Sequence, residues 1–238
     1  MIIAIDGTVA SGKSTAARRL AQRLDYLYIN TGLMYRGVAA YCRQHGIPTN
    51  DQRAVALHVK FLAVDLRNEP DGQHVHVNDH DLTAAATAPD IGAFVSDIAD
   101  NPTVRDVLVR AQQRLGRAAG NAVLEGRDIG SVVFPDAPVK FYVDADVRER
   151  ARRRLADDIK KHPALTLDEV EAATRARDER DRTRPVGALM RVPDAILIDT
   201  THNAGPDATV DQMLAHLAKS TNPIRPINPI RPTDDCHA

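Results

Sequence analysis

The chain has 238 residues, 43% of them hydrophobic and 26% charged, so it has enough apolar material for a folded domain and is not of the disordered class. Its 31 Lys and Arg residues nearly balance 32 Asp and Glu residues, and aromatic residues make up 4%, which disfavours nucleic-acid binding by bulk charge or base stacking. No apolar run approaches the roughly 20 residues of a membrane span, so we expect no membrane partner.

Two features favour a cytoplasmic protein. Cys42 and Cys236 lie far apart in the sequence, so a disulfide framework is not expected and a reducing compartment fits. The N-terminal sequence MIIAID leads directly into a strand pattern without a basic segment, so we expect no signal peptide.

The first sixty residues alternate between strand and helix patterns. Ile2–Ile5 is an uninterrupted apolar run, typical of a strand covered on both faces. A glycine-containing turn then leads to a helix over Ser14–Leu24. A strand over Tyr26–Ile29, a helix over Leu33–Arg43 and a helix over Ala54–Leu62, capped by Asn50 or Asp51, follow in that order.

The middle of the chain has a different pattern. Val64–Arg67 and His74–Asn78 alternate polar and apolar residues around the turn sequence Glu69-Pro-Asp-Gly72, which predicts an antiparallel hairpin. Helical patterns resume at Ile91–Ala99 and Pro102–Ala118.

Three further buried strands are expected over Val123–Leu124, Val139–Val143 and Ala195–Ile198, with a long Arg-rich helical region, Val147–Arg184, before the last. Strands that alternate with helices predict an α/β fold, here a five-stranded parallel sheet with helices on both faces. The hairpin is then an insertion, assigned to residues 64–90 of one domain over residues 1–220. Residues 221–238 are proline-rich, with NPIRPI followed by NPIRPT, and are expected to be a disordered tail.

An eight-residue motif predicts a phosphate-binding loop (P-loop). Residues 7–14, GTVASGKS, match G-x-x-x-x-G-K-[ST] between the first strand and the first helix. The glycines let backbone N–H groups surround a phosphate, and the helix N-terminus adds partial positive charge. We expect Lys13 to reach the β- and γ-phosphates of ATP and Ser14 to bind Mg²⁺. The expected ATP-binding residues are Gly7, Thr8, Val9, Ala10, Ser11, Gly12, Lys13, Ser14 and Thr15.

Several classes of nucleotide-binding protein fit poorly. The sequence has no N/TKxD-type base reader of a GTPase, and the segment Val123–Asp128 only half resembles the strand of a motor ATPase. Small-molecule kinases remain, and these need a second site facing the P-loop. A regulatory ATP-binding module without catalysis is the alternative, but it has little use for an ordered set of arginines.

Four stretches supply candidates for such a second site. Arg outnumbers Lys by 25 to six, and the arginine fork binds phosphate in a bidentate manner, although codon bias also explains this ratio. The alternative for the two helical stretches is a solvated face with ion pairs of small energy. The stretches contain Thr31, Tyr35 and Arg36; Glu125–Gly130; Arg148, Arg150, Arg152, Arg153 and Arg154; and Arg177, Arg180, Asp181 and Arg184 at helical spacing.

Together these segments resemble the cytidylate kinase family of bacteria, whose members phosphorylate CMP and dCMP with ATP. The likeness runs in order over residues 2–201 through IAIDG, GKST, NTGLMYRGVA, EGRDIGSVVFPDAPVKFYVDA, RDERDRTRP and DAILIDTT. It implies a P-loop kinase fold, a small β-containing insertion in the nucleoside monophosphate-binding region, and an Arg-rich lid within residues 148–184. It also implies Mg²⁺ as cofactor, CMP and dCMP as substrates, and a monomer.

The resemblance also implies roles for single residues. Arg36 and Arg127 correspond to clamps on the acceptor phosphate, and Ser96, Arg105 and Asp128 to cytosine readers. The ribose contacts correspond to Arg177 and Asp181, a further nucleotide contact to Arg184, and the catalytic lid arginines to Arg150, Arg153 and Arg154. The substrate-binding residues expected in full are Thr31, Tyr35, Arg36, Ser96, Arg105, Gly126, Arg127, Asp128, Arg177, Asp181 and Arg184. Thr8 stands where the family usually has proline, which leaves the loop entry freer.

A histidine-rich stretch invites a competing hypothesis. His74 and His76 fall on one face of a predicted strand, and Asp79 and His80 follow, close to a metallo-hydrolase pattern. The Asp-His pair is displaced by one residue, which turns the ligands the wrong way on a strand. A polar, exposed strand face is the interpretation we favour over a zinc site.

Overall fold

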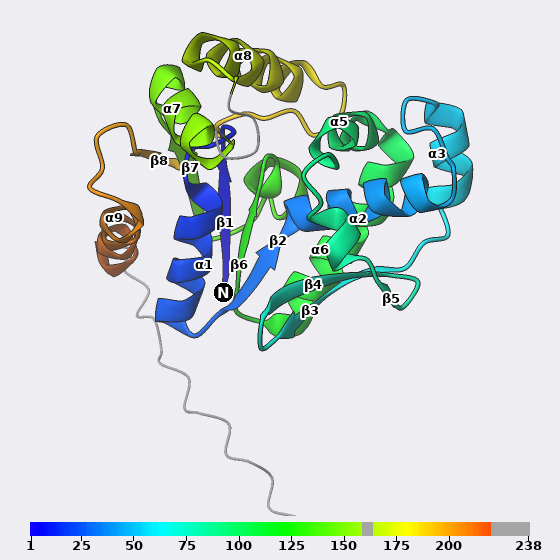
Figure 1. Ribbon diagram of the computed structural model, residues 1–238. Helices are drawn as coiled ribbons and strands as arrows, with labels where there is room; N and C mark the ends of the chain where they lie inside the picture. Colours follow the sequence, from blue (N-terminus) through cyan, green and yellow to red (C-terminus); the bar gives the residue numbers. More distant parts are fainter. Residues whose placement is uncertain (159–163, 220–238) are drawn as a thin grey trace, which may run out of the picture.

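The computed structural model describes residues 1–158 and 164–219, and its centre is a five-stranded sheet (Figure 1). All four neighbouring pairs are parallel, in the order β2-β6-β1-β7-β8. The strands are β1 (Ile2–Gly7), β2 (Leu27–Asn30), β6 (Ala122–Gly126), β7 (Val139–Asp144) and β8 (Ile196–Asp199). The expected parallel sheet is confirmed, with several strands longer by one to three residues than their apolar runs indicate.

Helices cover both faces of the sheet, as expected. Alternating residues of β1 face opposite sides, so Ile3 and Ile5 pack with α1 (Lys13–Leu24) and α9 (Pro206–Lys219). Ala4 faces the other side, where α2 (Thr31–Gln44) and α6 (Pro102–Ala119) pack. Helix α9 was not predicted from the sequence, and it buries Val210, Met213 and Leu217 against the sheet and α1.

The inserted hairpin is also confirmed. Strands β3 (Val64–Glu69) and β4 (Gly72–Val77) are antiparallel, with Leu66 opposite Val75, and a short third strand, β5 (His80–Asp81), extends the pair. Its apolar face packs on a second core built by α2, α5 and α6. The remaining helices of this region are α3 (Gln52–Val59), capped by Asp51, α4 (Thr83–Ala86) and α5 (Gly92–Asp100).

The Arg-rich helical region expected over Val147–Arg184 contains two helices. They are α7 (Val147–Asp158) and α8 (Leu167–Thr183), and α8 begins with a capping box in which the Thr166 hydroxyl and Glu169 carboxylate bond each other's backbone N–H groups. Figure 1 shows both helices over the end of the sheet at which β1 ends. One π-helical turn, η1 (Ile129–Val133), follows β6 and has no signal in the apolar pattern.

Some expectations concern residues beyond this description. The proline-rich tail, residues 221–238, and Cys236 lie outside the described residues, as do residues 159–163 within the expected lid. In the described part of the chain, no helix combines the length and apolar character needed to cross a membrane.

Candidate functional site

The P-loop joins β1 to α1 in a conformation that leaves backbone N–H groups for a ligand. Gly7 is required because a Cβ there would overlap the carbonyl oxygen of Val143, and Gly12 has a φ of +84° at the start of α1. No described side chain caps the N-terminus of α1, whereas Asn30 caps α2 through the N–H of Leu33 at 3.1 Å. The uncapped end of α1 is therefore suited to an anion.

Lys13 is a buried cation at the head of this helix. Its Nζ donates a hydrogen bond to the Thr8 carbonyl at 3.0 Å, and the residue is 5% exposed. Burial lowers the pKa of Lys13 to about 7, and Arg127 acts in the same direction, while Glu125 opposes the shift. The site therefore holds a lysine whose positive charge is favoured by an incoming anion.

One cavity of about 720 Å³ connects the P-loop to the arginines. At one end it is lined by Val9, Ala10, Gly12, Lys13 and Ser14, which we call the phosphate-loop end. At the other it is lined by all the residues expected to bind the second substrate, the arginine-rich end: Thr31, Tyr35, Arg36, Ser96, Arg105, Gly126, Arg127, Asp128, Arg177, Asp181 and Arg184. The structure therefore brings together residues from six elements and their connections.

The other P-loop residues lie outside this lining. Thr8 and Ser11 are fully buried, and their hydroxyls donate to the Asp144 carboxylate at 2.6 Å and to the Thr8 carbonyl at 3.0 Å. Thr15 lines a neighbouring cavity of about 1040 Å³ between α1 and the hairpin. These side chains shape the loop, whose backbone N–H groups are the kind that can surround an anion.

A charge network organises the arginine-rich end. The Asp181 carboxylate accepts from Arg127 Nε at 2.8 Å and from Arg184 at 2.7 Å. Burial by itself would raise the pKa of Asp181, but Arg127, Arg184 and Arg177 hold it below the ordinary value. Burial lowers the pKa of Arg177 to about 10, and its Nε has no hydrogen-bond partner among the described residues. The cavity therefore carries excess positive charge that an anionic ligand relieves.

Arg105 and Asp128 form a buried ion pair at this end. Arg105 also donates to the Ala99 carbonyl at 3.2 Å and lies 5.7 Å from the ring centre of Tyr35. Burial raises the pKa of the Asp128 carboxyl, although Arg105 opposes the shift. Gly187, with a φ of +65°, allows this packing because a Cβ there would overlap the Arg105 guanidinium. Gly187 has no signal in the sequence pattern, and its role is identified by this contact.

The arginines of α7 separate into three environments. Arg153 and Arg154 line the cavity, and Arg153 donates to the Thr200 carbonyl at 2.6 Å. Arg148 and Arg152 are more than half exposed and pair with carboxylates of α7 and α8. Arg150 is 4% exposed and lies outside the cavity lining, against α8 and the P-loop. The structure thus brings two of the three expected lid arginines to the cavity.

Three acidic residues at strand ends were present in the motifs but received no role in the sequence analysis. The Asp6 carboxylate accepts from the N–H groups of Ile129 and Gly130, each at 2.8 Å, and burial raises the pKa of Asp6 to about 7. Glu125 lines the cavity, and Asp144 binds Thr8. An acidic residue at the end of a buried parallel strand is the signal that identifies them, because ligands bind at this edge of such sheets.

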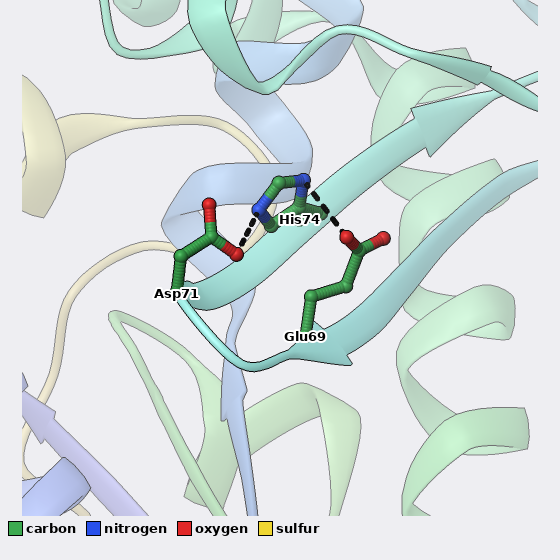
Figure 2. A group of neighbouring side chains, drawn as sticks. All are labelled: Glu69, Asp71 and His74. Carbon is green, nitrogen blue, oxygen red and sulfur yellow. Dashed lines mark hydrogen bonds and ion pairs between the residues drawn. The ribbon is translucent and has the colours of Figure 1, made fainter.

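The histidine-rich hairpin is arranged differently from a metallo-hydrolase pattern. Asp79 pairs with Arg67 at 2.9 Å, and His80 is exposed. Around His74, Figure 2 shows Asp71 and Glu69 at opposite sides of the ring. Its Nε2 lies 2.9 Å from Asp71, and its Nδ1 lies 2.8 Å from Asp81 and 3.9 Å from Glu69.

Hydrogen bonding to Asp81, and then to Asp71, raises the pKa of His74. Both ring nitrogens of His74 are already hydrogen-bonded to carboxylates, and this geometry favours the polar-face interpretation.

Comparisons with known proteins show which family this chain is similar to. A family model described as cytidylate kinase matches residues 3–220. The cytidylate kinase of Salinibacter ruber is 43% identical over 205 residues, covering 84% of this chain and 90% of that protein. That of Symbiobacterium thermophilum is 41% identical over 221 residues, covering 92% and 97%.

A crystal structure of an uncharacterized protein from Eubacterium ventriosum shares the fold, with a TM-score of 0.50 and 11% identity, and the match covers 92% of this chain and 99% of that one. The family model and the two curated relatives span most of the chain. The chain therefore belongs to the cytidylate kinase family.

Proposed function

We propose that the protein transfers the γ-phosphoryl group of ATP to CMP or dCMP, giving CDP or dCDP and ADP, as a step of pyrimidine nucleotide metabolism. The observation that carries this proposal is the single cavity with Lys13 at one end and the Arg105–Asp128 pair at the other. A triphosphate on the P-loop and a monophosphate at the arginine-rich end would share this space. Membership of the family supports the same reaction.

ATP is proposed to bind at the phosphate-loop end. The N–H groups at the start of α1 and the Lys13 ammonium would contact its β- and γ-phosphates. The Ser14 hydroxyl and the Glu125 carboxylate both line the cavity, and such oxygen donors suit Mg²⁺. Bound there, Mg²⁺ would neutralise charge on the phosphate oxygens. The residues present therefore fit the cofactor.

The acceptor nucleotide is proposed to bind at the arginine-rich end. Arg36 and Arg127 would hold its phosphate, and Arg177 and Asp181 its ribose hydroxyls. Asp128 and Ser96 would accept from the exocyclic amine of cytosine, which uracil lacks, with Arg105 holding Asp128 in place. Arg184, paired with Asp181 and with Asp100 at 2.6 Å, would complete the wall of this pocket.

Phosphoryl transfer between these ends needs alignment more than acid–base chemistry. The acceptor phosphate is already an anion, so no strong general base is required. The cationic groups Lys13, Arg153 and Arg154 would neutralise the charge that spreads over the transferring group. Residues 148–184 would act as the lid that excludes water from an exposed γ-phosphate.

The proposal also covers the oligomeric state of the protein and its location in the cell. We propose a monomer, as the resemblance to the cytidylate kinase family implies. A cytoplasmic location is proposed because nucleoside phosphates are substrates of the cell interior and Cys42 is a buried free thiol.

The test is an ADP-release assay with MgATP and, in turn, CMP, dCMP, UMP, AMP, GMP and no acceptor. We expect turnover with CMP and dCMP to exceed that with any other acceptor. Equal turnover with UMP would overturn the role given to Asp128. ADP release without an acceptor would indicate an ATPase and refute the transfer reaction.

A further inference from the structure

A buried ion pair joins the two Arg-rich helices next to the P-loop. Arg150 of α7 donates from its NH1 to the Asp178 carboxylate of α8 at 2.6 Å. Arg150 is 4% exposed and Asp178 3%, whereas the neighbouring Arg148 and Arg152 of α7 are more than half exposed. A buried ion pair adds little to stability by itself, because desolvation of the two charges offsets their attraction. Its position therefore invites a functional explanation.

Both partners of this pair bind one residue of the P-loop. The Asp178 carboxylate accepts from the Val9 N–H at 3.3 Å, and Arg150 donates to the Val9 carbonyl at 3.1 Å. The Arg150 Nε is occupied by the Ala145 carbonyl at 2.9 Å, which anchors the guanidinium to the end of β7. Both backbone polar groups of Val9 are thus held by groups from outside the loop.

The next residue shows why the loop needs this support. Ala10 has a φ of +58°, in the left-handed region, where the Cβ of a non-glycine residue comes too close to the following carbonyl oxygen. Val9 and Ala10 both line the cavity at its phosphate-loop end. A strained conformation persists where surrounding contacts determine it. The hydrogen bonds from Arg150 and Asp178 to Val9 lie directly before the strained Ala10 and are therefore placed to maintain its conformation.

We propose that Arg150 and Asp178 are positioning residues that hold the P-loop, through Val9, in the conformation that receives the phosphates of ATP. The inference rests on the proposed function for its kinetic readout. In this account Arg150 acts through Val9 and does not contact the transferring phosphoryl group. The Arg150–Asp178 pair also connects the P-loop to α7 and α8, so the position of these helices and the conformation of the loop depend on the same ion pair.

The test compares D178N and R150K with two matched controls. E179Q and R152K change exposed residues of the same helices, next to Asp178 and two residues after Arg150. For D178N and R150K we expect kcat/KM for ATP to fall at least about tenfold, because a small misplacement of substrate groups is costly. KM for CMP should stay within about twofold, and both controls should match the wild type. The double variant should have a kcat/KM for ATP no lower than that of the more impaired single variant, since the two residues act as a unit.

The proposal would be overturned if all four variants had the same kinetics. It would also be overturned if D178N and R150K raised KM for CMP as much as they impaired the use of ATP, because that result would indicate a general weakening of the fold. If neither D178N nor R150K folds, hydrogen exchange at the Val9 amide of the wild type decides. Protection is expected, and exchange at the rate of an open loop would refute the contact. Should the wild type fail to phosphorylate CMP, the proposed function fails separately, and MgATP affinities of D178N and E179Q, measured by titration calorimetry, still test the pair.

Discussion

At the phosphate-loop end of the cavity, the groups that face the ligand are neighbours in the chain, between Val9 and Ser14. At the arginine-rich end they come from α2, α5, α6, α8 and the segment after β6. The first end depends on backbone conformation, and the second on side-chain charges that hold one another in place. The phosphate-loop end is therefore sensitive to local geometry, whereas the arginine-rich end is sensitive to the balance of its ion pairs.

The largest effect is expected from removing the cation of the phosphate-loop end. K13A should lower kcat by about 10³-fold or more, because it removes a buried charge aimed at the transferring group. The melting temperature should stay close to that of the wild type, since within residues 1–158 and 164–219 the ammonium is held by a hydrogen bond to the Thr8 carbonyl. K60A, at an exposed position, is the control. Near-normal turnover by K13A would remove the basis of the assignment.

A smaller and more selective effect is expected at the arginine-rich end. D128A should reduce the preference for CMP over UMP by at least about tenfold, because the group that accepts from the cytosine amine is lost and Arg105 is left unpaired. The measurement is the ratio of kcat/KM for the two acceptors, with KM for ATP as the internal control. An unchanged ratio would mean that the base is recognised elsewhere.

The two ends meet at α7, where neighbouring arginines differ in environment. R153A should lower kcat about tenfold because Arg153 lines the cavity and would neutralise transition-state charge. R152A should stay within about twofold of the wild type because its side chain is 60% exposed. Equal losses in the two variants would indicate that the helix acts through its general charge.

The smallest effect is expected away from both ends, at the hairpin. The carboxylates of Asp81 and Asp71 raise the pKa of His74 above its ordinary value of about 6.5. Stabilisation by this raised pKa is fully present below pH ~6.5 and is lost as pH rises through the folded-state value. The melting temperature of the wild type should therefore be higher than that of H74Q at pH 6, and the difference between the two should be smaller at pH 8.5. H80Q serves as the control, and a difference that grows with pH would contradict the arrangement.

The same contrast between the ends explains what could be predicted from the sequence. The P-loop is local, so its spacing and the strand and helix around it were sufficient to locate it. The helical spacing of Arg177, Arg180, Asp181 and Arg184 was only partly informative. Arg180 turns to Asp97 and Asp100, at 2.6 and 2.8 Å, while the other three line the cavity.

Arg150 shows the limit most clearly. In sequence it is one of five similar arginines, and the resemblance to the cytidylate kinase family implied a lid role for it. Its burial depends on Asp178, which is 28 residues away on another helix, and on the backbone of Val9, 141 residues away. Helical periodicity contains no information on such partners. The turn at η1 and the approach of Gly187 to Arg105 depend on tertiary contacts in the same way.

The central claim is that donor and acceptor phosphates meet in one cavity. Its most direct test is calorimetric titration with a bisubstrate analogue in which adenosine and cytidine are joined by a pentaphosphate. We expect one molecule of the analogue to bind per chain and to be displaced by both ATP and CMP. D128A should weaken binding of the analogue through its cytidine, and K13A should weaken binding through its phosphate chain. An analogue displaced by ATP but indifferent to CMP would contradict the shared cavity.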